Sequence, residues 1–429
     1  MRSLPAFTTI ALSSVVAGAA VIDQLSAASL VITRTPLLPS LPECLISSYL
    51  GAFGGSTGQE HIYRPDTTCA ASTGAFDDLD AVTLIPLPSG EDGRVLWVGQ
   101  AGVGPTWKES DGYDDLMKSW ETTSSRAWKL ISGVDQAQDV FSQAGTEVIL
   151  HHTEPIMLLH TSNSSLLLHV PGSFLPIIDT LLPPHLVPVA LPAITSGGAG
   201  FEAVPSHLTK HLLDLTAKLQ FSPQIDRIIT EGIVLDDIRR HVRWLTGEAP
   251  SGIVSRHSFT PGAIKTAHWL KCTCRNLPGD LADYRSSSAK VEVTGAACSL
   301  EPFLYGFAPN VICHYPSLQN SSERIILSSH YDSRGSFGIP RAPGGNDDGS
   351  GSGHLLGVAE AIGSQGVEFE KQVTLVFFSG EEQGLLGSHA YAGELATNSF
   401  KVISTWDRIP PRPRRHCAIA PLGGSGRVP

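Results

Sequence analysis

The most constraining feature of this sequence is the alternation of strand-like and helix-like segments in its second half. Residues 324–330 (RIILSSH) and 372–380 (QVTLVFFSG) are largely apolar runs, and residues 354–363 (HLLGVAEAIG) between them carry apolar side chains at helical spacing. A continuous apolar run of this length is typical of a central strand covered on both faces. Alternating strands and helices therefore predict an α/β domain with a mixed, largely parallel sheet flanked by helices.

Chain length and turn residues predict how the rest of the chain is organised. A chain of 429 residues is too long for one ordinary domain, so two or three are expected. Residues 20–193 hold short strand-like runs separated by Gly, Pro, Ser and Asp, which predict a β-rich N-terminal region. Residues 194–200 (ITSGGAG) have the composition of a linker, and we expect the α/β domain over residues 201–397. No motif assigns the β-rich region a role, so a propeptide, an accessory domain and a lid over the site all stay open.

The N-terminus has the pattern of a secretory signal peptide over residues 1–19. Arg2 is followed by an apolar run and by AGA at residues 17–19, which matches an A-x-A cleavage site. The run is too short to span a bilayer, and no later run reaches the roughly 18 apolar residues that would. We expect a secreted protein, with a vacuolar location as the other option, no membrane span, and glycosylation at the sequons of Asn163 and Asn320.

Net charge and cysteine content narrow the partners and the chemistry. The formal net charge of -11 argues against nucleic acid or an anionic membrane as the main partner. Seven cysteines in an exported chain predict disulfides. Cys272 and Cys274 could instead form half of a zinc site, but their spacing is poor and no matching pair follows. Disulfides or buried thiols are the preferred interpretation.

Three polar motifs fall at the predicted strand ends, where sheets of this kind place their chemistry. His330-Tyr331-Asp332 leaves the first apolar run, residues 346–351 (NDDGSG) open the helical segment, and Gly380-Glu381-Glu382 leaves the second run. Each motif alone has a structural explanation, because Asp and Glu favour helix N-termini and a single histidine is often structural. Together they supply one imidazole and several carboxylates, a ligand set suited to zinc.

The density of acidic groups is itself an argument for a metal. Like charges within about 4–6 Å raise one another's pKa and reduce stability, whereas a divalent cation converts the repulsion into binding. Two metal ions roughly 3.5–4 Å apart could share one carboxylate and one water. One of the adjacent glutamates could then bind metal while the other takes the proton of the water.

The run HYDSR…APGGNDDGSG…FFSGEEQGLLGS…Y resembles the secreted co-catalytic di-zinc aminopeptidases, a family that includes aminopeptidase Y, bacterial leucyl aminopeptidases and fungal peptide hydrolases. The resemblance covers residues 240–395. It implies a zinc exopeptidase fold, two zinc ions per intact site, and peptide or protein substrates with a free N-terminus. It also implies the following roles: zinc ligation by His330 and Glu382, bridging of the two ions by Asp347, orientation of His330 by Asp332, and general-base catalysis by Glu381.

The same family has a further acidic ligand and a late histidine. Asp407 stands at about the right distance for the acidic ligand, and His416 is the weaker candidate for the histidine. Residues 398–429 are rich in Pro and Arg, which predicts a solvated tail. We therefore expect a domain that is truncated at its C-terminus and a chain that is impaired in activity.

The predicted function is that of a secreted zinc-dependent aminopeptidase in which Glu381 activates a water molecule. One alternative is a non-catalytic binding or scaffold relative of the same fold. Another is an enzyme similar to glutaminyl cyclases, for which a single zinc would be expected. Retention of His330, Asp347, Glu381 and Glu382 favours an enzyme over a scaffold.

Overall fold

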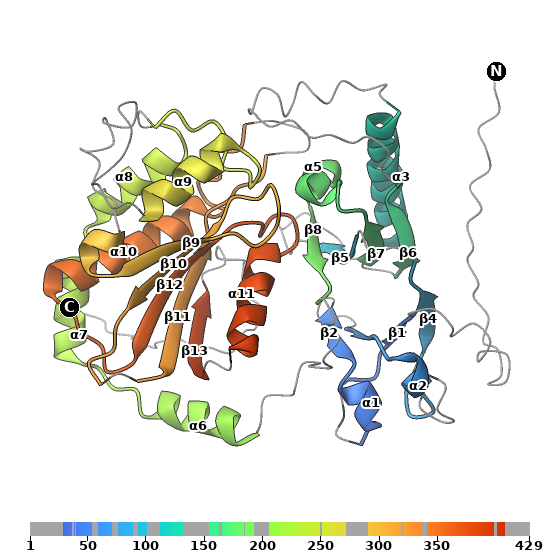
Figure 1. Cartoon of the computed structure of the whole chain (residues 1–429), viewed down its shortest axis with the longest axis horizontal. Helices are drawn as coiled ribbons and strands as arrows, with labels where there is room; N and C mark the ends of the chain where they lie inside the picture. The colour runs from blue at the N-terminus through green and yellow to red at the C-terminus, as the bar shows by residue number, and fades with distance from the viewer. Residues whose placement is uncertain are drawn as a thin grey trace, which may run out of the picture. The chain divides into compact units, whose positions relative to one another are not determined.

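A computed structural model of the chain describes most of its length (Figure 1). The described residues are 29–36, 38, 40–53, 59–70, 76–88, 93–100, 112–132, 154–162, 165–183, 185–192, 206–248, 251–271, 291–319, 321–335, 341–398 and 401–407. Several predictions fall outside them: the signal peptide (1–19), the linker (194–200), Asn163, Asn320, Cys272, Cys274, Cys417 and His416. In the described part of the chain, no helix is long and apolar enough to cross a membrane.

The described chain divides into two compact units, residues 1–91 with 192–213 and residues 92–191 with 214–429. The first unit contains an antiparallel sheet of four strands in the order β2-β3-β1-β4. Their bounds are Ser29–Thr33 for β1, Tyr49–Phe53 for β2, Glu60–Tyr63 for β3 and Thr83–Pro86 for β4. Helix α6, Ser206–Ala217, contains the point where the second stretch of this unit ends.

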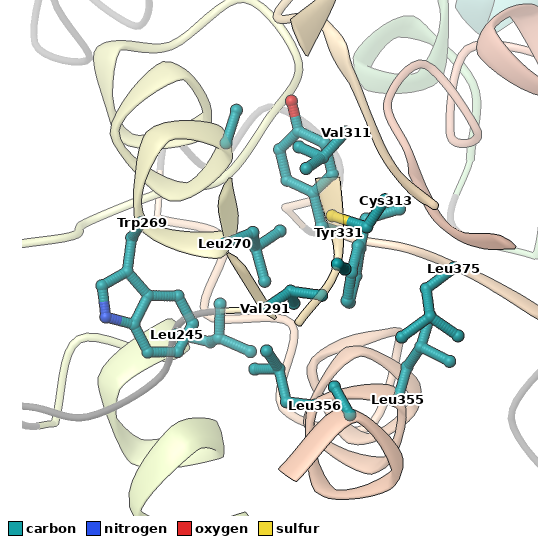
Figure 2. Packing of buried hydrophobic residues seen from close by; sticks show 14 of the residues in the cluster. Leu245, Trp269, Leu270, Val291, Val311, Cys313, Tyr331, Leu355, Leu356 and Leu375 are labelled. Carbon is teal, nitrogen blue, oxygen red and sulfur yellow. The ribbon is translucent and has the colours of Figure 1, made fainter. Parts of the chain in front are cut away.

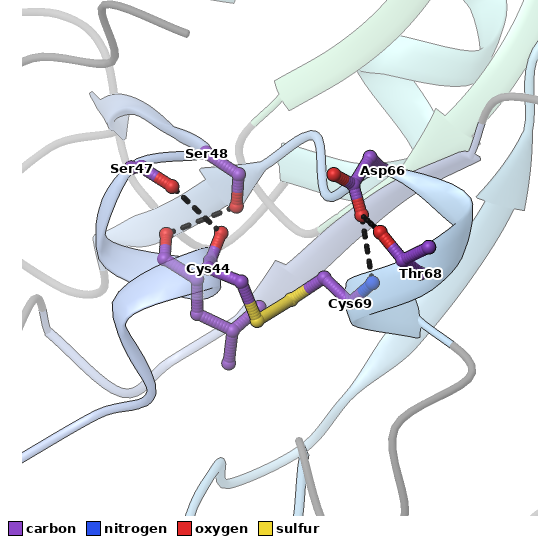
Figure 3. Close-up of a disulfide and its surroundings, with 7 residues drawn as sticks. Cys44, Ser47, Ser48, Asp66, Thr68 and Cys69 are labelled. Carbon is purple, nitrogen blue, oxygen red and sulfur yellow. Dashed lines mark hydrogen bonds between the residues drawn. A yellow bond between two sulfur atoms is a disulfide. The ribbon is translucent and has the colours of Figure 1, made fainter.

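A disulfide reinforces the small core of the first unit (Figure 3). Cys44 of helix α1, Glu43–Ile46, is bonded to Cys69 of helix α2, Thr67–Ala70. Each of these helices has only four residues, too few to be stable alone. The disulfide therefore holds together two short elements over a core that includes Val31, Leu45 and Tyr63.

The second unit contains two sheets, of which the smaller is antiparallel in the order β6-β7-β5-β8. Its strands are Arg94–Gln100 (β5), Met157–Thr161 (β6), Ser165–Val170 (β7) and Leu186–Ala190 (β8). Two helices accompany it, Gly112–Ile131 (α3) and Ile178–Leu181 (α5). All six residues of β7 are buried, and Leu166 and Leu168 pack with Leu96 and Val98 of β5.

The larger sheet of the second unit has five strands in the order β13-β11-β12-β10-β9. Strand β11, Glu323–His330, pairs in parallel with β12, Gln372–Phe378, and with β13, Lys401–Asp407. Strand β10, Asn310–Tyr315, pairs antiparallel with β12 and with β9, Ala297–Glu301. The predicted mixed sheet flanked by helices is thus confirmed, with parallel pairing on both sides of β11.

Helices cover both faces of this sheet, as the apolar run of β12 requires (Figure 1). Its side chains alternate between two clusters because neighbouring residues of a strand point to opposite faces. Val373, Leu375 and Phe377 lie in one cluster, and Val376 and Phe378 lie in the other. The helices on the first side are Leu235–Leu245 (α8), Pro261–Lys271 (α9) and Gly349–Gln365 (α10), and Leu386–Thr397 (α11) lies on the second. Helix α7, Pro223–Gly232, packs against α10.

Figure 2 shows the first of these clusters from close by. Trp269 and Leu270 of α9 and Leu355 and Leu356 of α10 lie around the strand residues, and Trp244 of α8 stacks on Trp269 with ring centroids 3.9 Å apart. Burying side chains of this size stabilises the fold by roughly 1.5–3 kcal/mol each. This core fixes β11, β12 and α10, the three elements from which the polar motifs extend.

Two further findings bear on the sequence predictions. Disulfides were expected, and the structure forms two among its described cysteines, Cys44–Cys69 and Cys298–Cys313. The solvated tail was expected from residue 398, but residues 401–407 form strand β13. The segment KVISTWD carries β-branched and aromatic residues that suit a strand, and Val402 packs against the sheet. The prediction of a tail rested on the Pro and Arg residues after residue 408 and overlooked this strand.

Candidate active site

The three polar motifs meet at one edge of the larger sheet. His330 is the last residue of β11 and is paired with Phe378, the last residue of the parallel strand β12. Parallel strands place their carboxyl ends at the same edge of a sheet, so Glu381 and Glu382 emerge beside His330. Asp347 lies just before α10, and the Ser352 hydroxyl of that helix donates to the carbonyl of His330 at 2.9 Å.

His330 contacts a carboxylate on each side of its ring. Its Nε2 atom lies 3.0 Å from Oδ1 of Asp347 and 4.0 Å from Oε2 of Glu381. Its Nδ1 atom lies 3.3 Å from Oδ1 of Asp332. The imidazole is buried, at 8% exposed, while the side chain of Asp347 is 57% exposed. The ring therefore presents Nε2 toward Asp347 and Glu381 while Asp332 holds its other nitrogen.

The carboxylate of Asp332 is itself held in place. Its Oδ2 atom accepts a hydrogen bond from the hydroxyl of Ser258 at 2.8 Å and from the backbone N–H of Glu382 at 3.4 Å. The Ser258 oxygen in turn accepts from the N–H of Gly380 at 2.9 Å. Asp332 thus links the end of β11 to the turn that follows β12, and it is fully buried.

The structure assigns different positions to the two adjacent aspartates. Asp348 is the N-cap of α10, and its side chain accepts from the N–H of Gly351 at 2.7 Å. Asp347 instead reaches His330. The structural explanation considered for the Asp-Asp pair therefore holds for Asp348, while Asp347 stands as predicted beside the histidine. The two glutamates also do not open a helix, because α11 begins at Leu386, after the turn.

Negative charge accumulates at this edge of the sheet. Burial raises the pKa of Glu382 well above its usual value, and the charges of Glu381, Asp347 and Asp332 raise it further, against the opposing effect of His330. Burial alone would lower the pKa of His330, but Glu381, Asp332 and Asp347 raise it well above the usual value. The carboxylates therefore favour a positive charge between them. The imidazolium of His330 supplies one such charge, and a divalent cation would supply more.

The donor set fits zinc in chemistry and in part in spacing. Two ligands of one tetrahedral zinc, bound at about 2.0–2.2 Å, lie roughly 3.4 Å apart. Nε2 of His330 and Oδ1 of Asp347 approach that separation at 3.0 Å. Within the described ranges, no group of three or more His, Cys, Asp or Glu side chains is arranged so that it could hold a metal ion. The side chains would have to converge further on an ion.

Asp407 is placed at this edge by its backbone alone. It ends β13, and its register opposite Ser328 puts it two pairs before His330. The prediction that Asp407 is a ligand thus remains a prediction, now with a backbone position that brings it to the same sheet edge.

Sequence analysis missed Arg256, a fully buried residue that supports the site. Its guanidinium donates four hydrogen bonds to backbone carbonyls, with distances of 2.7–2.9 Å. The acceptors, which belong to the segments before and after the site, are the carbonyls of Leu245, Tyr331, Pro343 and Gly344. Burial lowers the pKa of Arg256 to about 10, and Asp332 and Asp348 oppose that shift. Arg256 ties the end of β11 to the loop that carries Asp347.

Ser258 was also missed, because no local sequence pattern marks it. The polar segment SRHS at residues 255–258 matches no catalytic pattern, and its partners lie 74 to 122 residues further along the chain. A run of four polar residues between apolar neighbours is the signal that could have drawn attention to it.

Comparison with known proteins matches this region to a peptidase family. The profile of Peptidase family M28 matches residues 310–411, a stretch that contains all three polar motifs. Aminopeptidase YwaD of Bacillus subtilis is 32% identical over 107 residues, which is 25% of this chain and 22% of that protein. A probable zinc metalloprotease of Leptosphaeria maculans is 27% identical over 150 residues, 34% of each chain. The chain thus spans about a fifth to a third of the length of these relatives.

Solved structures show a weaker likeness. The LapA aminopeptidase of Legionella pneumophila is 18% identical, with a TM-score of 0.41 over 59% of this chain and 65% of that chain. A glutaminyl cyclase of Porphyromonas gingivalis is 22% identical, with a TM-score of 0.30 over 41% of this chain and 58% of that chain. The second half of the chain is thus similar to Peptidase family M28, and the sequence relatives that match it there are named an aminopeptidase and a probable zinc metalloprotease.

Proposed function

We propose that this chain is a zinc-dependent aminopeptidase that removes N-terminal residues from peptides. The observation that carries the proposal is the placement of His330, whose Nε2 faces Asp347 at 3.0 Å and Glu381 at 4.0 Å while Asp332 holds Nδ1. Metal-bound histidines commonly donate their other ring N–H to a carboxylate in this way. The names of the sequence relatives, an aminopeptidase and a zinc metalloprotease, agree with the proposal.

In the proposed site, His330, Asp347 and Glu382 would hold zinc, and Asp407 would be a further ligand. Zinc, when bound, acts as a Lewis acid toward the peptide carbonyl and makes water nucleophilic near neutral pH. Asp332 orients the ring of His330. Its second oxygen stays bonded to Ser258, which keeps the carboxylate from rotating away from the ring.

Glu381 is proposed as the general base. Its carboxylate is 29% exposed, so it is open to a substrate and a water, unlike the buried Glu382. It takes the proton of the attacking water and passes it to the nitrogen of the leaving amine. The exposed carboxylate of Asp347 and that of Glu381 both lie near Nε2 of His330, which supports an attack at this point.

Export is part of the proposal as well. The signal-peptide pattern at residues 1–19 and the disulfides agree with an oxidising compartment, where disulfides persist. Mass determination of the mature N-terminus after expression in a secreting host checks this point. Recovery of an N-terminus near Ala20 supports export.

The decisive assay compares the wild-type chain with Glu381→Gln, using an aminoacyl p-nitroanilide in the presence of zinc. The variant keeps the shape of the side chain and is expected to lose about 10²–10⁴-fold in kcat, the usual contribution of a general base. An N-acetylated substrate is the control, because an aminopeptidase requires the free amine. Equal rates for the two proteins would overturn the role of Glu381. Cyclisation of an N-terminal glutaminyl peptide would favour the cyclase alternative, and zinc binding without either reaction would favour a scaffold.

A further inference from the structure

A second buried pair of a histidine and a carboxylate lies apart from the residues assigned to zinc. Asp179 belongs to α5, beside the smaller sheet, and its side chain is fully buried. Nε2 of His257 lies 3.1 Å from both oxygens of this carboxylate. In sequence, His257 stands between Arg256 and Ser258, which bond the backbone of Tyr331 and the carboxylate of Asp332 at the candidate site.

This pair is balanced in charge. Burial alone would raise the pKa of Asp179, but His257 and Arg334 lower it, and a hydrogen bond from the side chain of Gln383 lowers it further. Burial would lower the pKa of His257, whereas Asp179 raises it, with a net rise. Asp179 therefore stays ionised in a site where an isolated carboxylate would be costly.

The partners of Asp179 lead directly to the turn that carries the two glutamates. Gln383 follows Glu382 in sequence, and its Nε2 atom lies 3.2 Å from Nε2 of His257, the ring that contacts Asp179. One residue further, the carbonyl of Gly384 accepts a hydrogen bond from the N–H of Ala190 at the end of β8. The distance is 3.1 Å, and Gly384 has φ of +121°, a conformation that a residue with a side chain rarely adopts.

The chain from α5 to β8 also accepts hydrogen bonds from the loop after β11. Arg334, two residues beyond Asp332, donates to three carbonyls between α5 and β8, at 2.9, 3.1 and 3.2 Å. These carbonyls belong to Leu186, Leu182 and Pro183. Residues 179–183 and 185–190, which we name the bracing segment, thus contact the loop after β11 directly and the turn after β12 through Ala190 and His257.

Apolar packing continues along the same line. Leu386, the first residue of α11, and Phe307 belong to one buried cluster with Leu96 of β5 and Leu186 of β8. The turn 381–385 is therefore followed by a residue packed on the smaller sheet, and it makes polar contacts at Gln383 and Gly384.

We propose that the bracing segment positions the catalytic turn, with Asp179 acting through Gln383 and His257 on the placement of Glu381 and Glu382. The proposal rests on the proposed peptidase function of that turn. It also assigns a role to residues 92–191: they remain part of the working site, which is not expected of a propeptide that is removed. Asp179 is a positioning residue, because its carboxylate is bound to His257, which is not among the residues assigned to zinc or to the reaction.

The test compares Asp179→Asn with a matched control in the full-length chain. The control is Glu360→Gln, because Glu360 and the buried His241 form a similar pair at 2.8 Å between α10 and α8. We expect Asp179→Asn to lower kcat for an aminoacyl p-nitroanilide by about 10–100-fold with KM changed less than about threefold, as for partners of metal ligands. The dissociation constant for zinc, measured with zinc alone, is expected to rise by a similar factor. The control keeps both values within about twofold of wild type, whatever its effect on melting temperature.

A second variant covers the case in which Asp179→Asn does not fold. Gln383→Met keeps the length of the side chain and removes its amide, while leaving the Asp179–His257 contact in place. It is expected to fold, as judged by circular dichroism, and to lower kcat about 10-fold. A folded variant of either kind with wild-type kcat and zinc affinity would overturn the positioning role while leaving the peptidase function intact. A wild-type chain that neither bound zinc nor hydrolysed the substrate would overturn both proposals.

Discussion

His257 and His330 are both buried, both contact carboxylates, and both lie in the second unit, yet their surroundings differ in charge. Around His257, the carboxylate of Asp179 is met by the imidazole itself, by Arg334 and by the amide of Gln383. Around His330, the carboxylates of Asp332, Asp347, Glu381 and Glu382 act on one another. The first cluster is complete as a structural ion pair, whereas the second accumulates negative charge.

The difference in charge is the reason why we assign a structural role to His257 and propose a functional one for His330. Proteins place buried charges in pairs because an unpaired buried charge is expensive. The cluster around His330 departs from this rule and includes the exposed carboxylate of Asp347. Such a cluster is a candidate for binding a cation. Under the proposal, the balanced cluster positions the turn that carries Glu381 and Glu382, since Gln383 of that turn contacts His257.

The comparison is tested most strongly by removing the imidazole from the acid-rich cluster. His330→Ala should lower peptide hydrolysis more than about 100-fold, because loss of an outer partner of a ligand alone costs 10–100-fold. His241→Ala is the matched control, since His241 is also buried and bonded to a carboxylate. Kinetic assays at saturating zinc check the prediction, and similar losses in both variants would show that the effect is one of folding.

A smaller effect is expected where the ring of His330 is oriented. Asp332→Asn should lower zinc affinity or kcat by about 10–100-fold, because the amide can present an N–H where the ring needs an acceptor. If the negative charge of Asp332 orients the ring of His330, Asp332→Ala should lower zinc affinity or kcat by a similar factor. An Asp332→Asn protein with wild-type zinc affinity and kcat would remove Asp332 from the site.

The balanced cluster should show itself in the pH dependence of stability. The pKa of Asp179 is lowered from 3.8, so its contribution is present above that pH and is lost as the pH falls through the folded value. The pKa of His257 is raised from 6.5, so its contribution is full below 6.5 and is lost as the pH rises through the folded value.

The advantage of wild type over Asp179→Asn in melting temperature should therefore be largest between pH 3.8 and 6.5, and it should shrink as the pH rises through the raised pKa of His257. The charges of Asp332 and Arg334 also act on His257, in opposite directions. Thermal melts in metal-free buffer measure this difference in melting temperature without a contribution from zinc binding. A difference that does not change with pH would mean that the two groups do not form an ion pair.

The smallest effect on catalysis is expected in the first unit, which holds none of the assigned residues. Opening the Cys44–Cys69 disulfide by a Cys44→Ser and Cys69→Ser double substitution releases a loop with a sequence separation of 25. Chain entropy makes such a bridge worth about 3.5 kcal/mol. The first unit should become sensitive to protease while kcat stays within about twofold of wild type. A large fall in kcat would contradict the assignment of the site to the second unit alone.

The elements that could be predicted from sequence are those with a strong local signal. The apolar run of β12 has six buried residues, and the helical spacing at residues 354–363 falls within α10. The polar motifs were found because each follows such an element and because strand ends converge. His330, Asp347 and Glu381 accordingly lie together, although their roles stay predictions.

What sequence could not give are the contacts between distant segments. Asp179 meets His257 across 78 residues, and Arg256 reaches Gly344 across 88. Neither residue has a local pattern that separates it from an ordinary surface charge. Strand β13 was missed because Pro and Arg immediately after it outweighed the strand propensity of seven residues.

The central claim is that the cluster around His330 binds zinc. The most direct measurement is the zinc content per chain, by dialysis and elemental analysis, of wild type, His330→Ala and His241→Ala. The account predicts that wild type and His241→Ala bind zinc equally and that His330→Ala loses at least one ion. Equal zinc content in wild type and His330→Ala, or hydrolysis by wild type in the presence of excess chelator, would contradict it.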